Sequence, residues 1–371
     1  MHERVCILTT VHSPFDTRVF HKEAKTLVSA GYDVTLVVQH SCQEVVDGVR
    51  IVPLPKPRSR FDRMTRLALS ALRIGLRQRA AIFHFHDPEL IPVGIVLKLF
   101  GKRVIYDVHE ATPEDILVKE WVPERLRKLA SRVLGRLERI SCGYFDHIIV
   151  ASRYTGRTFP EGRTTTIANY PLSCFTRNGE PRNRVAEGPA TLVYVGGLTE
   201  DRGLLVMIEA MRLLEGEAVE LHLLGPCENG LRSVLDSCPA NVKYLGFLSL
   251  DQVFQQLKKA CVGLLLLQPT PAYWHAAENT NKLFEYMASG LPVVASSFPG
   301  LQEIIEGNGC GVCVDPQSPQ EVATAIRSLL RNAELRSRMG TNGLHAVSAK
   351  FNWDVEARTL KALYAQLLKD N

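Results

Sequence analysis

The feature that most constrains the fold is an alternation of strand-like and helix-like segments that runs through the chain twice. Short runs rich in Val and Ile, such as RVCILTT at 4–10, YDVTLVVQ at 32–39 and HIIVAS at 147–152, are separated by longer segments with helical periodicity. This order is typical of βα units that build a parallel sheet. Residues 1–175 therefore predict one doubly wound α/β domain.

A break in the alternation separates this domain from a second one. Residues 176–190, TRNGEPRNRVAEGPA, are rich in Pro, Gly and charge and predict a linker. The alternation resumes over 191–351, and residues 352–371 form an amphipathic helical segment. Since 371 residues exceed what a single core usually holds, we expect two Rossmann-like domains that face each other across a cleft.

Composition places the chain among folded globular proteins, with 46% hydrophobic and 22% charged residues. The amino terminus lacks a secretion-signal pattern, and the longest apolar runs fall short of the roughly 18 to 20 residues of a spanning helix. The nine cysteines are scattered, as in reduced cytosolic proteins. We therefore expect a cytoplasmic protein, and no metal at the isolated Cys310 and Cys313 pair.

The stretch AAENTNKLFEYMASGLPVVASS, at 276–297, combines structural signals with unexpected charges. Thr280 or Asn279 is suited to cap a helix over 281–289, and Gly290 to follow its end. Apolar positions of this helix point inward, and a buried strand follows. The sequence predicts a loop, a short helix and a strand.

Two groups of polar residues in the second domain suggest a binding site. Lys282 and Glu285 share one face near the start of this helix, where free N–H groups favour an anion. In YVGGLTEDRG, Gly196 and Gly197 permit close backbone approach and Arg202 offers donors that suit phosphate. Both loops follow strands, so we expect them at one sheet edge. The alternative is a surface ion pair and a loop salt bridge.

The motifs GGLTEDRG, ENTNKLFEYMASGLPVVAS, GCGVCVDP and FNWDVEARTLKALYAQLL resemble those of the retaining glycosyltransferases of family 4, which have the GT-B fold. The amino-terminal HSPFDTRVFHKEAKTLVSAGYDVTLV, HDPEL and YDVHE resemble bacterial members that build surface polysaccharides. The likeness spans essentially the whole chain.

This resemblance implies a nucleotide-sugar donor in the carboxy-terminal domain, an acceptor in the amino-terminal domain, and a terminal helix that crosses back to the latter. It favours a UDP-sugar, with a GDP-sugar next. It implies front-side displacement, in which the diphosphate leaves and takes the acceptor proton. No Asp-x-Asp occurs in the chain, so we expect no metal cofactor.

The resemblance also implies roles for individual residues. Glu285 should hold the ribose hydroxyls, Arg202 and Lys282 should meet the diphosphate, and His109 should lie near the reacting sugar. The remaining expected donor contacts are Gly196, Gly197, Gly246, Phe247, Leu248, Thr280 and Asn281.

Two departures from the family pattern affect this site. The first of two expected glutamates is displaced by one residue, so that Ala277 occupies its position and Glu278 either reaches the donor sugar from a reshaped loop or makes no contact. Gly197 replaces a phosphate-binding cation of the family pattern. Arg202 and Lys282 are therefore expected to neutralise a larger share of the phosphate charge.

Other polar residues are expected on the acceptor side. Asp16 and Arg18 follow the first strand, where Arg18 either meets phosphate or acceptor or pairs with Asp16. His86 resembles half of an acid–base or metal pair, but more simply shapes the floor of the cleft, as does Glu110. We expect no metal ligand among them.

Basic amphipathic segments near 56–79 and 124–140 suggest a partner. Their arginines are interleaved with apolar residues, as in helices that lie on anionic membranes, although solvated domain helices are the alternative. No nucleic-acid recognition motif accompanies them. We therefore expect a peripheral enzyme on the inner face of the cell membrane that extends a lipid-linked or nascent surface glycan. The alternatives are another GT-B enzyme, such as a sugar-nucleotide epimerase, or a non-catalytic nucleotide- or glycan-binding scaffold.

Overall fold

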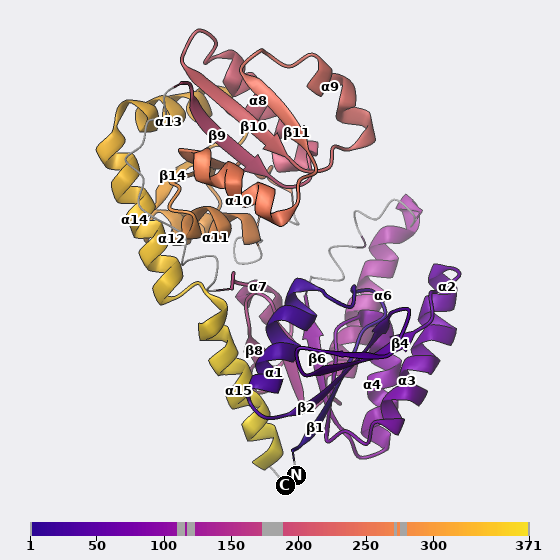
Figure 1. The fold of residues 1–371 in the computed structure, drawn as a ribbon. Coiled ribbons are helices and arrows are strands. Elements are labelled where there is room, and N and C mark those ends of the chain that lie inside the picture. The colour runs from indigo at the N-terminus through magenta and orange to yellow at the C-terminus, as the bar shows by residue number, and fades with distance from the viewer. Residues whose placement is uncertain are drawn as a thin grey trace. The chain divides into compact units, whose positions relative to one another are not determined.

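The protein consists of two compact units, seen in a computed structural model (Figure 1). Unit 1 comprises Met1–Asn169 and Trp353–Asn371, and unit 2 comprises Tyr170–Asn352. The structure describes residues 2–109, 116, 123–172, 188–270, 273–274 and 280–369.

An eight-stranded sheet forms the centre of unit 1, in the order β3-β4-β2-β1-β5-β6-β7-β8. All neighbours are parallel except the hairpin of β3 and β4. The strands are β1 (Arg4–Leu8), β2 (Asp33–Gln39), β3 (Glu44–Val46), β4 (Val49–Leu54), β5 (Ile82–Phe85), β6 (Arg103–Val108), β7 (His147–Val150) and β8 (Thr164–Thr166).

Helical segments connect these strands. They are the π-helical η1 (Thr17–Ala24), α1 (Lys25–Ser29), α2 (Arg60–Asp62), the π-helical η2 (Arg63–Leu67), α3 (Ala68–Arg77), η3 (Pro88–Leu90), α4 (Ile91–Leu99), α6 (Glu124–Cys142), α7 (Arg153–Gly156) and η4 (Glu161–Arg163). Gly31 follows α1 with φ +90°, a left-handed conformation that suits a glycine just after a helix. The basic segment predicted near 56–79 is helical only from Arg60 to Arg77.

The carboxy-terminal helix α15 (Trp353–Lys369) belongs to unit 1. Its Trp353 Nε1 donates to Thr26 Oγ1 at 2.9 Å, and the Tyr364 hydroxyl lies 2.8 Å from His84 Nδ1 in the interior of the unit. Leu360, Leu363 and Leu367 are buried as well. The prediction that the terminal helix returns to the first domain is therefore confirmed.

A six-stranded parallel sheet forms the centre of unit 2, in the order β11-β10-β9-β12-β13-β14. Strand order reverses between β9 and β12, which is where doubly wound sheets bind ligands. The strands are β9 (Ala190–Val195), β10 (Val219–Leu224), β11 (Val242–Gly246), β12 (Val262–Leu265), β13 (Val293–Ser296) and β14 (Gly311–Val314).

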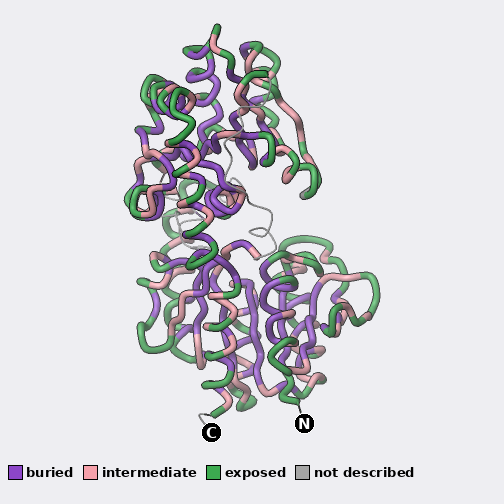
Figure 2. Tube along the Cα trace, turned by 60° about the vertical axis from the view of Figure 1, so that its left-hand side comes forward, coloured by how far each residue is buried: buried purple, intermediate pink, exposed green. Residues whose placement is uncertain are grey.

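Helices cover both faces of this sheet and bury two apolar clusters against it, so the strands lie at the centre of the unit (Figure 2). Within the described residues, no helix is both long and apolar enough to cross a membrane. The helices are η6 (Glu200–Arg202), α8 (Leu204–Arg212), η7 (Asn229–Leu231), α9 (Arg232–Asp236), α10 (Leu250–Lys259), α11 (Asn281–Ala288), α12 (Pro299–Ile305), α13 (Pro319–Arg331) and α14 (Ala333–Ala349).

The boundary between the units falls earlier than the sequence predicted. Tyr170, expected in the first domain, packs its ring against Phe284 and Phe351, with ring centroids 4.7 and 5.4 Å apart. This aromatic contact assigns Tyr170 to unit 2. Most of the predicted linker, 173–187, lies outside the described residues.

Candidate functional site

The carboxyl ends of three strands meet at one edge of the unit 2 sheet. Val195 at the end of β9 pairs with Leu224 of β10, and Leu224 pairs with Gly246 at the end of β11. The loops that begin at Gly196 and Phe247 therefore start side by side. We call this the unit 2 edge.

Glycines at this edge let two loops touch backbone to backbone. Gly225 follows β10 with φ +136°, and a Cβ there would lie 2.0 Å from the carbonyl oxygen of Gly196. Gly196 itself has φ +151°, and the Tyr194 hydroxyl donates to the Gly197 carbonyl at 2.9 Å. A side chain at Gly196 or Gly225 would strain the backbone, since this region of φ suits only glycine.

Arg202 lies over this glycine loop. A Cβ placed on Gly197 would be 3.0 Å from Arg202 Nη1, and one on Gly196 would be 3.7 Å away. Arg202 Nε donates to the Tyr273 hydroxyl at 3.1 Å. The Arg202 guanidinium thus lies next to Gly196 and Gly197, as the sequence predicted. It fits there because the two glycines have no side chains.

The loop after β9 is fastened to the loop that leads from β12 to α11. The amide of Gln268 donates to the Asp201 carbonyl at 2.8 Å. A Cβ on Gly203 would lie 2.1 Å from the Leu266 carbonyl, so the two backbones are in contact. The Tyr273 hydroxyl, which accepts from Arg202, belongs to the second of these loops. Backbone and side-chain contacts therefore fix the loop after β9 against Leu266, Gln268 and Tyr273, which follow β12.

Helix α11 is positioned by one buried tyrosine. Thr280 occupies the N-cap position, Asn281 begins the helix, and Leu283, Phe284 and Met287 are buried as predicted. The fully buried Tyr286 hydroxyl accepts the Val195 amide at 2.9 Å, and burial raises the pKa of Tyr286 well above its ordinary value.

A close contact completes this support. A Cβ on Gly263 of β12 would lie 2.5 Å from the Tyr286 ring, so the ring rests directly on the strand backbone. The hydrogen bond and this contact tie α11 to β9 and β12, which are the strands that flank the reversal of strand order. Sequence reasoning did not identify Tyr286, because its position on the apolar face of the helix suggests only packing.

Lys282 and Glu285 form an ion pair with each other. Lys282 Nζ lies 3.0 and 3.3 Å from the two carboxylate oxygens of Glu285, and the side chains are 34% and 21% exposed. Such i,i+3 pairs contribute only about 0.2–0.5 kcal/mol, so a ligand anion can replace the carboxylate at little cost. Both predicted readings of these residues are compatible with this geometry.

The end of β11 contributes an exposed ring to the same edge. Gly246 has φ +71° and its carbonyl accepts the Gly225 amide at 2.8 Å. Phe247 is 81% exposed, whereas Leu248 packs against the core cluster that includes α11. An exposed aromatic face at a strand end is suited to stack on a planar base.

Unit 1 carries a very different set of charges at its own carboxyl edge. Arg18 Nη2 donates to both carboxylate oxygens of Asp107, at 2.9 and 3.1 Å, and Nη1 donates to the Ile167 carbonyl at 2.9 Å. Arg18 Nε lies 2.9 Å from Glu23 Oε1. These three side chains are at most 4% exposed. We call them, with His84, His86 and His109, the unit 1 cluster.

Burial and charge set the protonation of this cluster. Burial acts to raise the pKa of Asp107, but Arg18 and neighbouring histidines hold it well below its usual value. Burial raises the pKa of Glu23, assisted by the Asp107 charge. Burial lowers the pKa of His86 and of His109.

Three histidines lie in ring contact at this edge. His86 Nδ1 is 2.9 Å from His109 Nε2, and the His109 and His12 ring centroids are 4.9 Å apart. His86 is fully buried, while His109 is 19% exposed. The group therefore reaches the surface through His109 and through His12, whose side chain is 23% exposed.

The structure corrects two expectations for unit 1. Arg18 was expected either to meet phosphate or acceptor or to pair with Asp16, but it is buried and bonded to Asp107. The side-chain pair of Asp16 with Arg18 is also wrong, because Asp16 caps η1 by accepting the amides of Arg18 and Val19, and Arg18 pairs with Asp107 instead. Neither Asp107 nor Glu23 was identified from the sequence.

Two predicted site residues, Glu110 and Glu278, lie outside the described residues. The cap candidate Asn279 and Ala277 lie there as well.

The unit 1 cluster contains groups that can ligate a metal. Glu23, His84, His86 and Asp107 each place a ligand atom within 4.8 Å of the others. However, the Arg18 guanidinium already lies against both carboxylates and supplies the positive charge that a metal ion would bring. The cluster is therefore organised around hydrogen bonds and ion pairs, and metal independence stays a prediction.

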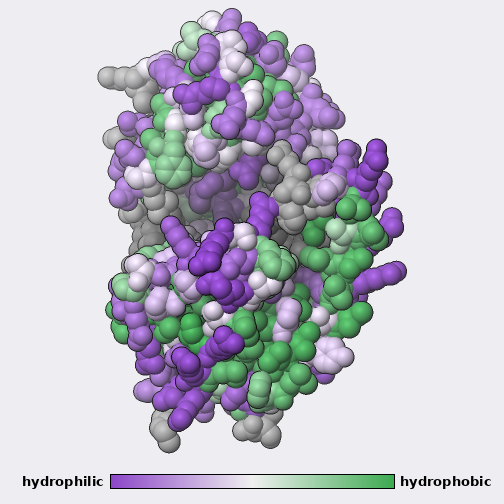
Figure 3. Space-filling model, turned by 90° about the vertical axis from the view of Figure 1, so that its right-hand side faces the viewer, coloured by the Kyte–Doolittle hydropathy of each residue, from purple (hydrophilic) through white to green (hydrophobic). Residues whose placement is uncertain are grey.

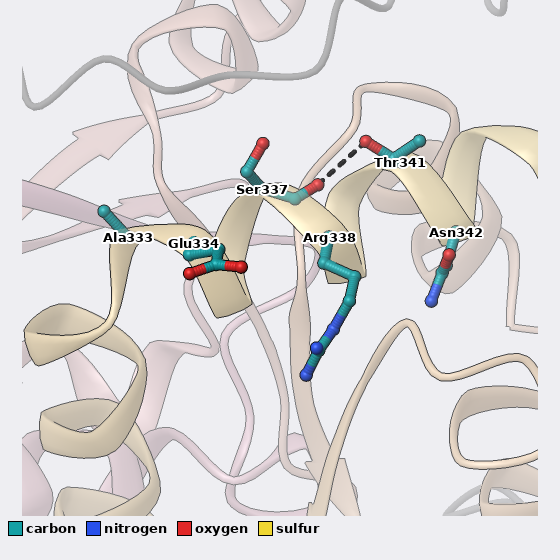
Figure 4. A pocket seen from close by; sticks show the side chains of 6 residues that line it. All are labelled: Ala333, Glu334, Ser337, Arg338, Thr341 and Asn342. Atoms are coloured by element: carbon teal, nitrogen blue, oxygen red, sulfur yellow. Dashed lines mark hydrogen bonds between the residues drawn. The ribbon is translucent and has the colours of Figure 1, made fainter.

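A surface hollow of about 520 Å³ lies along α14, lined by Ala333, Glu334, Ser337, Arg338, Thr341 and Asn342 (Figure 4). Asn342 donates to the Gly309 carbonyl just before β14, at the amino edge of the sheet. The hollow is thus at the opposite edge from the predicted site.

Two family models match the chain, one in each unit. The model described as "Glycosyltransferase Family 4" matches residues 16–169, and the model described as "Glycosyl transferases group 1" matches residues 189–332. Together they span most of the chain.

Curated relatives are similar over part of their length. The GDP-mannose-dependent alpha-(1-6)-phosphatidylinositol monomannoside mannosyltransferase of Mycobacterium tuberculosis is 27% identical over 63% of this chain and 64% of that protein. An uncharacterized glycosyltransferase of Methanocaldococcus jannaschii is 29% identical over 48% of this chain and 46% of that protein. The chain thus spans about half to two thirds of these two relatives.

Solved structures share the whole fold. Sucrose-phosphate synthase from Thermosynechococcus elongatus superimposes with a TM-score of 0.80 at 19% identity, covering 100% of both chains. Anabaena HepE, in complex with UDP-glucose, gives 0.72 at 14% identity, covering 98% of this chain and 100% of that one. The chain belongs to the family 4 glycosyltransferases and has the GT-B fold.

Proposed function

We propose that this protein is a retaining glycosyltransferase that moves a sugar from a nucleotide-sugar to a lipid-linked or nascent cell-surface glycan. The observation that carries the proposal is the unit 2 edge. There Arg202 bonds to Tyr273, the Gln268 amide bonds to the loop after β9, and Tyr286 ties α11 to the end of β9. A UDP-sugar is the favoured donor and a GDP-sugar the next. One structural neighbour was solved with UDP-glucose, and one relative is named for GDP-mannose.

Donor binding would exchange one ion pair for another. The diphosphate takes Lys282 from Glu285 and also meets Arg202, because both cations lie beside donor groups of backbone or helix terminus. The released Glu285 carboxylate then accepts hydrogen bonds from the ribose hydroxyls. The exposed Phe247 ring stacks on the base.

The transfer itself follows from this charge arrangement. The bond between the anomeric carbon and the diphosphate oxygen breaks, and the acceptor hydroxyl oxygen bonds to the same face of that carbon. A diphosphate oxygen takes the hydroxyl proton, which balances the step. Arg202 and Lys282 stabilise the charge that develops on the leaving group, and we expect transfer to persist in the presence of a chelator.

Binding of nucleotides tests the donor site. The melting temperature of the purified protein is measured with UDP, GDP, ADP and UDP- and GDP-sugars, because a ligand that binds the native state raises it. We expect a rise with one nucleotide, and a loss of affinity of about 10- to 100-fold in Arg202→Ala and Glu285→Ala. The controls are Arg212→Ala and Glu209→Ala, an ion pair on the far end of α8. A folded protein with no response to any nucleotide would overturn the proposal.

A successful binder must also transfer sugar. The product anomer, read by NMR after incubation with donor and membrane extract, decides between retention and inversion. Binding without transfer would instead identify a non-catalytic scaffold.

An exposed apolar stripe on unit 1 supports a membrane partner. Along α6, the side chains of Leu126, Leu129, Val133, Leu137 and Ile140 are 46–64% exposed at helical spacing. Exposed basic residues stand next to the stripe, namely Arg125, Lys128, Arg132, Arg136 and Arg139. Figure 3 shows hydrophobic side chains gathered on the lower part of the face in view, and exposed residues of that kind include Phe61, Met64, Leu99 and Phe100.

The occupant we propose for this stripe is an anionic bilayer, since arginines beside apolar side chains bind lipid head groups and acyl chains together. The helix predicted near 56–79 contributes less to this exposed apolar surface than the sequence suggested. Leu67, Ala68 and Ala71 are buried in the core of unit 1, while Phe61, Met64 and Leu69 are exposed.

Flotation with vesicles tests this surface. The double variant Leu129→Glu/Leu137→Glu is expected to lose at least about 10-fold in binding to phosphatidylglycerol vesicles, while Leu213→Glu, an exposed leucine of unit 2, binds as wild type. Equal binding to neutral vesicles, or no effect of the double variant, would remove the bilayer as partner.

A further inference from the structure

Another group of metal-ligating side chains lies at the carboxyl end of β2, apart from the unit 1 cluster and the unit 2 edge. In the segment HSCQE, His40 follows β2, Glu44 begins β3, and Cys42 lies midway between them. Residues spaced in this alternating way carry their side chains on one side of an extended chain. An imidazole, a thiol and a carboxylate are therefore presented together by one short segment.

The potential ligand atoms of this segment are close enough to share one ion. His40 Nε2 lies 2.6 Å from Glu44 Oε1 and 3.9 Å from Cys42 Sγ, and the ligand atoms of all three residues lie within 4.8 Å of one another. In a tetrahedral zinc site with bonds of about 2.0–2.3 Å, ligand atoms are about 3.2–3.7 Å apart. Shifts of only about 1 Å would therefore place these three atoms around a zinc ion.

Strand β4 holds both ends of the segment. The His40 amide donates to the Leu54 carbonyl at 3.3 Å, and Glu44 stands opposite Ile51 in the antiparallel pair of β3 and β4. The backbone that carries the two outer ligands is thus fixed by the sheet before any ion binds. A fixed backbone lowers the entropy that a ligand set loses when it closes around an ion.

Charge and exposure also suit a cation from the solvent. Within the part of the chain that the structure describes, the only ion-pair partner of Glu44 is His40, whose ring is charged only when it holds a second proton. In the unit 1 cluster, by contrast, Arg18 supplies a permanent positive charge. The Glu44 side chain is 37% exposed and Cys42 is exposed as well, so an ion can reach them.

We propose that His40, Cys42 and Glu44 form a zinc site, with water in the fourth position. Nitrogen, sulfur and oxygen donors together select Zn²⁺ over Mg²⁺ and Ca²⁺, which prefer oxygen ligands alone. On binding, the Cys42 thiol releases its proton to the solvent, and bonds to the ion replace the contact between His40 and Glu44. The site lies in unit 1, outside the donor groups of unit 2, and does not depend on the proposed function.

Cobalt(II) tests the ligand set, because it occupies zinc sites and a thiolate bound to it gives a charge-transfer absorption in the near ultraviolet. We expect this absorption when CoCl₂ is added to the reduced full chain, and its loss when Zn²⁺ displaces the cobalt. Cys42→Ser should abolish the absorption. A cobalt spectrum of the wild type without the thiolate absorption would overturn the proposal, and this measurement needs no variant.

The same spectrum separates this site from the other possible one. Cobalt bound in the unit 1 cluster gives no thiolate absorption, because that cluster contains no cysteine. The control variant is Cys227→Ser, which removes another partly accessible thiol and should leave the absorption unchanged. Among the described residues, no group of possible metal ligands includes Cys227.

Competition with a chromophoric chelator measures the zinc affinity. We expect Cys42→Ser and His40→Ala to weaken Zn²⁺ binding at least about 10-fold, since each removes a direct ligand. Equal affinities of these variants and the wild type would overturn the site. The native chain should also bind Zn²⁺ at least about 10-fold more tightly than the chain in urea, because β4 positions the ligands only in the folded state. Equal binding by the unfolded chain would refute a site built by the fold.

Discussion

The two sheet edges of this protein use charge in opposite ways. In unit 1, Arg18 and Asp107 are buried and hydrogen-bonded to each other, and the buried Glu23 forms an ion pair with Arg18. In unit 2, Arg202 donates a hydrogen bond to the Tyr273 hydroxyl, and Lys282 forms a partly exposed ion pair with Glu285. Charges that are already satisfied support a structure, while charges that are weakly paired remain available to a ligand.

The largest expected effect comes from a substitution that disrupts the buried charges of unit 1. Arg18→Leu leaves two carboxylates facing each other without a counter-charge, and we expect the free energy of unfolding to fall by about 3–5 kcal/mol. Urea unfolding followed by circular dichroism measures it. A loss below about 1 kcal/mol would show that the cluster does not depend on Arg18.

A smaller loss is expected where unit 2 does contain a buried polar anchor. Tyr286→Phe leaves the Val195 amide without its acceptor, at a cost of about 1–3 kcal/mol, and also loosens α11 against the glycine loop. The free energy of unfolding and the nucleotide-induced rise in melting temperature are measured on the same variant. Tyr244→Phe, which removes only a donor to the Gly225 carbonyl, serves as the milder comparison. Unchanged stability in Tyr286→Phe would contradict the anchor.

The dependence of stability on pH distinguishes the two edges further. Burial lowers the pKa of His86, so between the unfolded value of about 6.5 and the lower native value only the unfolded chain takes up this proton. The stability that neutral His86 contributes is complete above pH 6.5 and is lost as the pH falls.

The difference in free energy of unfolding between the wild type and His86→Gln should therefore shrink by about 1 kcal/mol between pH 6.5 and 5.5. Lys282→Met in unit 2 should show no such trend over this range. A constant difference for His86→Gln would indicate that His86 is not held neutral.

The smallest expected change in stability is at Arg202. Arg202→Leu removes one hydrogen bond to Tyr273 from a half-buried loop, so we expect a loss of no more than about 1 kcal/mol, together with the loss of nucleotide affinity. Urea unfolding beside the nucleotide melting assay separates the two effects. A large loss of stability would show that Arg202 mainly supports the structure, as the buried charges of unit 1 do. It would argue against a role of Arg202 in ligand binding.

Local signals predicted the elements of this fold well. The strand at 147–152, the helix expected over 281–289 and the glycine after α1 depend on residues a few positions apart, and the structure shows β7, α11 and a left-handed Gly31 there. The approach of Arg202 to Gly196 and Gly197 was also accessible, because these residues share one short loop.

Contacts between distant segments were not accessible in this way. Arg18 follows β1 just as Asp16 does, and the sequence offered a ligand or Asp16 as its partner, but its actual partner, Asp107, lies 89 residues away in β6. Glu23 and Tyr286 sit on buried helix faces, where the pattern records only that a side chain points inward. The packing of strands and helices determines which polar atoms come into contact.

The sequence by itself determined the two doubly wound units, their order of elements and the family to which the chain belongs, because periodicity, turn residues and motifs are local properties. Only the tertiary structure decided which charges are buried together and which remain accessible. Burial multiplies the strength of an ion pair and the cost of an unpaired group, and it depends on which segments the fold brings into contact.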